Sequence, residues 1–205
     1  PAEAAGEQHF PVLLRFKLRR RGATTIDGYL PFRDISSSAY YFDAVKWAVN
    51  TGITSGTTAT TFSPDAACTR AQMVTFLWRA AGSPAPRSSV NPFRDINSGA
   101  YYYQAVLWAV EQGITSGTSS TTFSPDAIIT RGQTVMFLYR NAGSPASGTG
   151  SAFDDVKIGD YYSPAVRWAV ANGITSGTSA TTFSPSASCT RAQIVTFLYR
   201  TFAGW

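Results

Sequence analysis

One stretch of sequence recurs three times in this chain, and this repetition limits the fold more than any other feature. Three segments of 48 residues align with one another without a gap: 32–79, 93–140 and 153–200. Each contains the pattern ITSGT, two variable residues and TTFSP, at 53–64, 114–125 and 174–185. The segments between them, 80–92 and 141–152, are rich in Gly, Pro and Ser, which are typical of loops. The sequence therefore predicts three copies of one structural unit joined by short linkers.

Each unit is predicted to form two helices joined by a loop. In the first unit, apolar residues at helical spacing predict a helix over about 40–51, which Gly52 ends. A loop rich in Thr, Ser and Gly follows, and Thr69 with Gln72 then forms a capping box that begins a second helix. Equivalent pairs recur in the other two units: Thr130 with Gln133, and Thr190 with Gln193. We therefore expect a mainly helical protein with no sizeable sheet in 32–200.

A single helix pair of this length has little core, so we expect the units to pack on one another and make 32–205 one structural unit. The repetition alone allows two arrangements. The units either close around a pseudo-threefold axis or stack in a line.

The first 31 residues have a different pattern. Apolar residues at 12, 14, 16 and 18 alternate with Leu13 and three basic residues at 15, 17 and 19, which is the period of a strand. We expect residues 1–31 to form an N-terminal arm with a strand or a β-hairpin. A basic arm that binds an anionic polymer is the alternative interpretation.

Charge and composition favour binding over catalysis. The 205 residues carry 17 Lys and Arg against 12 Asp and Glu, and 14 of the 17 are Arg, which binds carboxylate or phosphate in bidentate fashion. Glycoside hydrolysis needs two carboxylates, yet Glu111 is the single glutamate within the three units. The single histidine, His9, argues against most zinc sites. We expect no enzyme activity, no metal, no cofactor, no nucleic-acid partner and no direct membrane insertion.

The repeated signature resembles that of the S-layer homology motif, which usually occurs as three tandem copies in bacterial surface proteins. It consists of Phe-x-Asp-Ile/Val, an Ala-Val-x-Trp-Ala helix preceded by tyrosines, Gly-Ile-Thr-x-Gly, Thr-Phe-x-Pro and Thr-Arg-Ala/Gly, and it covers 32–200. The resemblance implies a compact pseudo-trimer with grooves between neighbouring motifs. It also implies that these grooves bind secondary cell-wall polysaccharide, which often bears a pyruvate ketal, and so hold an extracellular protein on the bacterial cell wall.

The resemblance also assigns three sets of candidate polysaccharide-binding residues. The arginines of the Thr-Arg motif are Arg70, Arg131 and Arg191. At an exposed helix start, each arginine could hold a carboxylate beside free amides, or instead pair with an acidic neighbour in the next motif. The aspartates of Phe-x-Asp are Asp34, Asp95 and Asp155, for which capping of a turn is the alternative. The helix tryptophans are Trp47, Trp108 and Trp168, for which a place in the core is the alternative.

The chain departs from the family pattern in two places. Gln72 and its two equivalents stand where many members have Glu, and the common Asp-Gly of the loop is replaced, as by Ala59-Thr60. A module that binds a host or neighbouring surface protein is therefore the alternative function. Cys68 and Cys189 occupy equivalent positions where the second unit has Ile129, so we expect buried free thiols.

Overall fold

A computed structural model describes residues 30–150 and 153–203, which form six α-helices, two in each repeated unit. The strand or hairpin expected in the N-terminal arm lies outside these residues. The first helices of the three units are α1 (Phe42–Asn50), α3 (Tyr103–Glu111) and α5 (Ser163–Ala171). The second helices are α2 (Arg70–Ala80), α4 (Arg131–Asn141) and α6 (Arg191–Phe202). The mainly helical fold is confirmed.

The second helix of each unit begins with the predicted capping box. The Thr69 hydroxyl accepts a hydrogen bond from the Gln72 backbone N–H, and the Gln72 side chain accepts one from the Thr69 N–H. The same reciprocal pair begins α4 and α6. Two of the otherwise unpaired donors of each helix start are satisfied in this way.

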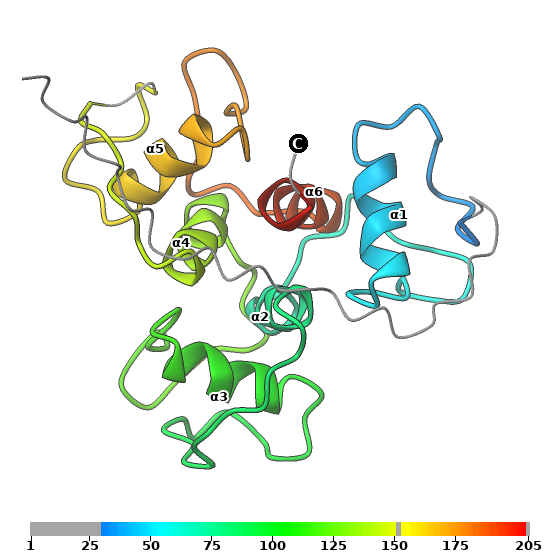
Figure 1. Cartoon of the computed structure of the whole chain (residues 1–205), viewed down its shortest axis with the longest axis vertical. Helices are drawn as coiled ribbons and strands as arrows, with labels where there is room; N and C mark the ends of the chain where they lie inside the picture. Colours follow the sequence, from blue (N-terminus) through cyan, green and yellow to red (C-terminus); the bar gives the residue numbers. More distant parts are fainter. Residues whose placement is uncertain (1–29, 151–152, 204–205) are drawn as a thin grey trace, which may run out of the picture.

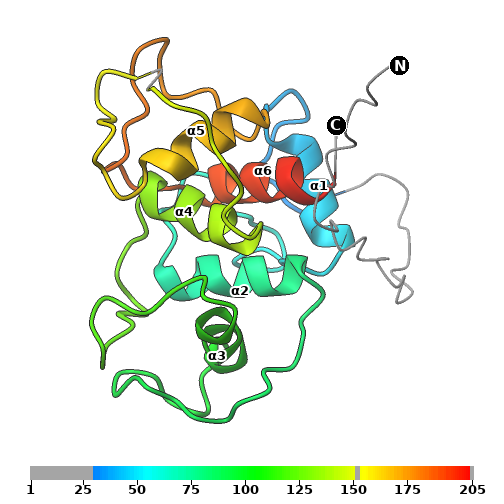
Figure 2. The ribbon, with the colours of Figure 1, turned by 60° about the vertical axis from the view of Figure 1, so that its left-hand side comes forward.

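The helices pair between units. Helix α2 packs on α3, α4 packs on α5, and α6 packs on α1. Figure 1 shows α2, α4 and α6 together at the centre, with α1, α3 and α5 outside them. Figure 2 shows α6, at the end of the chain, beside α1 at its start. Each unit therefore depends on a neighbour to cover its helices, and the third unit closes onto the first.

Three short backbone segments form a closed ring where the units meet. The backbone N–H of Cys68 donates to the Cys189 carbonyl at 3.0 Å, that of Cys189 donates to Ile129 at 3.0 Å, and that of Ile129 donates back to Cys68 at 2.9 Å. Antiparallel bridges flank these contacts between Ala67 and Thr190, Thr69 and Ile128, and Thr130 and Ser188. A ring of this kind is incompatible with a linear stack, so the arrangement is the pseudo-threefold one.

The core is continuous across the units. Phe62, Phe123 and Phe183, each from the loop between two helices of a unit, are fully buried. The phenylalanine that begins each unit packs against them, as Phe32 does on Phe62 with ring centroids 5.8 Å apart. These aromatic pairs pack the loop of each unit against the start of the same unit.

Candidate functional site

The arginine at the start of each second helix reaches into the next unit. Its Nε donates to the carbonyl oxygen of a loop phenylalanine there. The distances are 2.9 Å from Arg70 to Phe123, 2.9 Å from Arg131 to Phe183, and 2.8 Å from Arg191 to Phe62. Each arginine therefore joins two units, and the three contacts run once around the ring.

These arginines are buried, so the expected exposed helix start is wrong. Arg70 is 3% exposed, and its Cζ lies 4.8 Å from the ring centroid of Phe123 and 5.5 Å from that of Phe137. Arg131 and Arg191 lie between equivalent pairs of rings. The pattern of one unit could not show this, because the covering rings belong to the next unit. Contacts between a guanidinium and aromatic faces of this kind are attractive.

The amides at the helix start are not free either, which is a second correction. The Arg70 N–H donates to the Ala127 carbonyl at 2.9 Å, and the Ala71 N–H donates to Pro125 at 3.0 Å. Equivalent bonds begin α4 and α6. An anion at this site would therefore be bound by side chains.

A groove of about 310 Å³ lies beside Arg70 between the first two units, and we call it groove 1–2. Arg140, Gln133 and Met136 of α4 line it together with the loop 115–118. Tyr161 of the third unit completes the lining, which, within the part of the chain that the structure describes, contains two arginines and no acidic side chain. A groove with this lining is suited to an anionic, hydroxyl-rich ligand.

The charge on Arg70 is incompletely compensated inside the protein. Burial lowers the pKa of its guanidinium, and the nearby Tyr161 and Asp95 offset that effect only in part. Its Nη2 is buried and has no hydrogen-bond partner among the residues that the structure describes. The Nη2 atoms of Arg131 and Arg191 lie within 3.5 Å of Thr hydroxyls in the next unit. A buried donor without a partner is costly, so the charge of Arg70 is less well compensated than the charges of its two equivalents.

Two residues that line groove 1–2, Tyr161 and Arg140, belong to sets that recur in every unit, and the sequence prediction missed both sets. The first is a row of exposed tyrosines, Tyr40, Tyr101 and Tyr161, whose side chains are 66%, 60% and 59% exposed. The second is the arginine that ends each unit, which donates to a carbonyl of its own loop: Arg79 to Ile53, Arg140 to Ile114, and Arg200 to Ile174. The recurrence of these tyrosines and arginines at equivalent positions in all three units could have identified them from the sequence.

The aspartates expected at the site cap a loop within their own unit. Asp34 accepts hydrogen bonds from the backbone N–H groups of Phe62 at 2.9 Å and Ser63 at 2.7 Å. Asp95 and Asp155 do the same for Phe123 with Ser124 and for Phe183 with Ser184. Burial raises the pKa of Asp34, but these N–H groups outweigh it, so the pKa is lowered. Sugar contact by the aspartates stays a prediction, and capping, the alternative, is what the geometry shows.

The tryptophans lie mainly between helices. Trp108 and Trp168 are 5% and 8% exposed. Trp168 packs on Tyr139, and Trp47 packs on Tyr199, each with ring centroids 5.7 Å apart. Both contacts join the first helix of one unit to the second helix of the unit before it in the ring. Sugar contact by the tryptophans stays a prediction.

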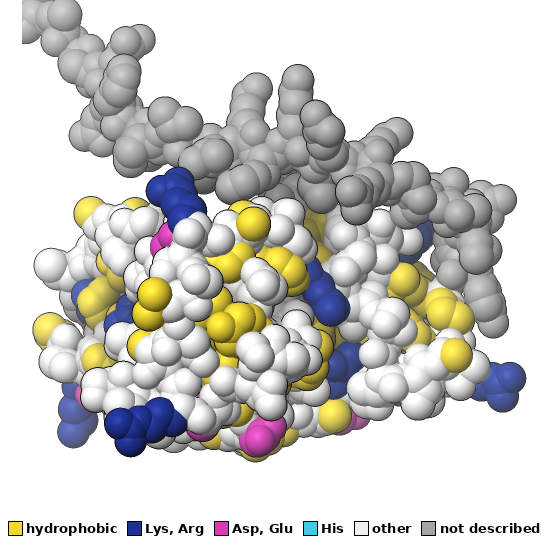
Figure 3. Space-filling view, turned by 90° about the horizontal axis from the view of Figure 1, so that it is seen from below, with side chains coloured by type: hydrophobic (Ala, Val, Ile, Leu, Met, Phe, Trp, Pro, Cys, Tyr) yellow, Lys and Arg dark blue, Asp and Glu magenta, His cyan; other side chains and the backbone are white. Residues whose placement is uncertain are grey.

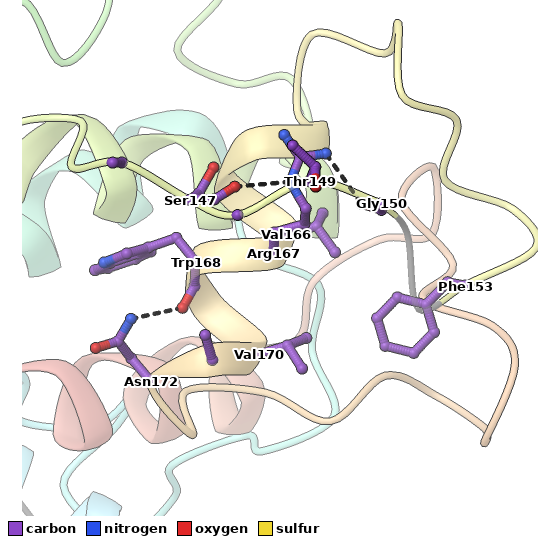
Figure 4. Close-up of a pocket in the computed structure, with 12 residues that line it drawn as sticks. Ser147, Thr149, Gly150, Phe153, Val166, Arg167, Trp168, Val170 and Asn172 are labelled. Atoms are coloured by element: carbon purple, nitrogen blue, oxygen red, sulfur yellow. Dashed lines mark hydrogen bonds between the residues drawn. The ribbon is translucent and has the colours of Figure 1, made fainter.

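A second cavity, of about 480 Å³, lies between α5 and the linker that precedes it (Figure 4). Arg167 holds the linker there by donating to the carbonyl oxygens of Ser147 and Gly150 and to the Ser163 hydroxyl. Because this guanidinium is already bonded, the cavity offers a ligand less polar recognition than groove 1–2.

Basic side chains stand out on the face seen in Figure 3 and acidic ones are sparse there, in keeping with the net charge of +5. Within 30–150 and 153–203, no group of three His, Cys, Asp or Glu side chains could hold a metal ion. Over the same residues, the helices are too short or too polar to cross a membrane.

Comparison with known proteins identifies the class of protein. The S-layer homology domain family matches residues 31–74, 92–135 and 152–195, and the chain belongs to this family. Its location is therefore the bacterial cell surface or cell wall, where it acts as an anchoring module.

This chain matches a small share of three longer relatives. The Surface-layer 125 kDa protein of Lysinibacillus sphaericus is 31% identical over 168 residues, 80% of this chain and 14% of that protein. The Endoglucanase of Bacillus sp. (strain KSM-635) is 31% identical over 169 residues, with shares of 80% and 18%. The Cell surface protein of Thermoanaerobacter kivui is 28% identical over 117 residues, with shares of 55% and 15%. The chain thus spans less than a fifth of each relative.

Proposed function

We propose that this chain holds a bacterial surface protein on the cell envelope by binding secondary cell-wall polysaccharide in the grooves between its motifs. The observation that carries the proposal is groove 1–2, in which Arg70 and Arg140 line the cavity with a Ser/Thr-rich loop, and none of the described lining residues is acidic. An acidic sugar substituent, such as the carboxylate of a pyruvate ketal, would lie beside two arginines in this groove and complement the positive charge of Arg70, which nearby groups offset only in part.

The other lining residues fit the rest of a sugar. Hydroxyl groups of the 115–118 loop and the Gln133 amide can exchange hydrogen bonds with sugar hydroxyls. The exposed ring of Tyr161 can cover an apolar sugar face at the groove rim. The tyrosine phenol keeps its polar end in water while its ring is covered.

Groove 1–2 is proposed to bind most tightly of the three. Met136 lines it, whereas the equivalent positions hold Thr75 and Thr196, whose buried hydroxyls donate to the carbonyls of Ala71 and Ala192. The Met side chain adds a flexible apolar wall beside the two arginines. In a pyruvate ketal, the methyl group would contact Met136 and the carboxylate would contact the arginines.

The test is sedimentation of the chain with purified cell walls, before and after removal of the secondary polysaccharide. Tyr161→Ala is the first variant, because the ring is 59% exposed and its loss leaves the core intact. We expect binding to weaken roughly 5- to 30-fold, or about 1–2 kcal/mol, and to fall further as salt rises. Tyr40→Ala and Tyr101→Ala report on the other grooves and should have smaller effects.

Ile158→Ala is the matched control, because Ile158 is 74% exposed and lies outside the lining of groove 1–2. It should bind as the parent does. Equal binding to walls stripped of polysaccharide would instead favour the protein-binding alternative. Unchanged binding by all three tyrosine variants would contradict the groove as the site.

A further inference from the structure

Cys68 and Cys189 face each other in the ring at the axis. The antiparallel bridge between Ala67 and Thr190 places the next residues along, Cys68 and Cys189, beside each other, where a single backbone hydrogen bond joins them. The Cys68 N–H donates to the Cys189 carbonyl oxygen at 3.0 Å. One segment comes from the first motif and the other from the third.

In a regular antiparallel pair, residues joined by backbone hydrogen bonds have Cα atoms about 5.5 Å apart. That separation falls within the range of about 4.4–6.8 Å found for disulfides. Both cysteines are fully buried, and Ile129 fills the third place of the ring. Two thiols are therefore held together where a cross-link needs little backbone movement.

We propose that Cys68 and Cys189 are a disulfide-forming pair that closes the ring of three motifs covalently. In the structure both are free thiols. Under oxidising conditions, one cysteine thiolate attacks a small disulfide such as oxidised glutathione and releases one thiol molecule. The second cysteine then attacks the mixed disulfide, releases a second thiol molecule, and forms the Cys68–Cys189 bond.

Burial decides when this reaction can occur. Burial raises the pKa of Cys68 to about 12 and that of Cys189 to about 11, so thiolate is scarce in the folded protein. The bond therefore forms while the chain folds in an oxidising medium, and a chain that has folded in the reduced state oxidises slowly. A cell-surface location is one in which such a bond persists.

The bond would join positions that are 121 residues apart, since 189 − 68 = 121. Cross-links that close long loops restrict the unfolded chain most. This bond would also tie together the two motifs that the chain itself leaves unlinked, the first and the third. It does not depend on what the grooves bind.

The experiment refolds the full chain from urea, once with dithiothreitol and once in a mixture of reduced and oxidised glutathione. The oxidised sample should have a mass two hydrogens lower, and a non-reducing digest should contain a peptide pair joined through Cys68 and Cys189. Its Tm should be roughly 5–15 °C higher than that of the reduced sample and return to the reduced value with dithiothreitol.

Cys68→Ala and Cys189→Ala are the matched controls, and neither should show a Tm that depends on the redox buffer. Recovery of two free thiols after oxidative refolding would overturn the proposal. So would a product that contains glutathione adducts or cross-linked dimers in place of the internal bond. Because the first measurement uses the unaltered chain, the result does not depend on whether a variant folds.

Discussion

Arg191 in the last motif donates from Nε to the carbonyl oxygen of Phe62 in the first, at 2.8 Å. The N–H of the same Phe62 donates to Asp34 at 2.9 Å. Phe62 therefore joins the capping carboxylate of its own motif to Arg191, which lies 129 positions further along the chain. Arg70 and Arg131 make the equivalent contacts through Phe123 and Phe183.

The buried arginines should contribute to stability as well as to binding. Replacing Arg191 with Ala removes a charge-assisted hydrogen bond and two ring contacts, and should lower the free energy of unfolding by about 1.5–3 kcal/mol. Thermal melts followed by circular dichroism measure this. Arg33→Ala, at an exposed arginine of the first motif, is the control and should leave the Tm nearly unchanged. An unchanged Tm for Arg191→Ala would show that the contact between motifs is not stabilising.

Asp34 and Arg191 should be energetically coupled although they bind opposite sides of the Phe62 residue. Asp34→Asn removes the charge that accepts from Phe62 and Ser63, and should cost about 1–2 kcal/mol. A double-mutant cycle with Arg191→Ala should give a coupling of about 0.5 kcal/mol or more. If the two substitutions lower the free energy of unfolding additively, Asp34 and Arg191 are not coupled through Phe62.

The Asp34 caps also predict an acid dependence. The pKa of Asp34 is lowered in the folded protein, so its contribution is present above the unfolded value of 3.8 and is lost as pH falls through the folded value. Urea titrations at descending pH measure this. Asp34→Asn should lose less stability than the parent between pH 5 and pH 3, and an equal loss would argue against the caps.

The two buried thiols should make the reduced protein less stable at alkaline pH. Their folded pKa values are about 12 and about 11 against a reference of 9.0. Above pH 9 the unfolded chain releases these protons while the folded chain keeps them, so stability present below pH 9 falls as pH rises toward the folded values. The loss is about 1 kcal/mol per pH unit for each thiol.

Urea titrations between pH 8 and pH 11, with dithiothreitol present, measure this loss. In the double variant Cys68→Ala and Cys189→Ala, the free energy of unfolding should fall less steeply with pH. The loss that remains in this variant should come from tyrosines such as Tyr40, whose pKa is also raised by burial. Equal slopes in parent and variant would contradict the assignment to the thiols.

Excising residues 80–140 should abolish cooperative folding. The deletion removes α3, which covers α2, and α4, which covers α5. It also removes Ile129, one of three members of the axial ring. Calorimetry should show no sharp unfolding transition, whereas a cooperative melt of the remainder would indicate independent motifs.

Local features of this fold could be predicted from the sequence, and contacts between motifs could not. The capping box of Thr69 and Gln72 depends on residues three apart, so its helix start was predicted correctly. The burial of Arg70 depends on Phe123 and Phe137 of the next motif. The sequence pattern of a single unit does not indicate which residues of a neighbouring unit pack against it. Trp168 shows the same limit, because its partner Tyr139 belongs to the preceding unit.

The ring that joins α6 to α1 has a mechanical consequence for an anchor that must resist pulling. In an open row of repeats, the end repeat is held by one interface, and a force on the chain can peel the repeats off one at a time. In the closed ring every motif is held on both sides. Releasing any one motif therefore breaks two arginine contacts and the axial backbone hydrogen bonds at the same time. Force therefore meets a single large barrier in place of a sequence of small ones.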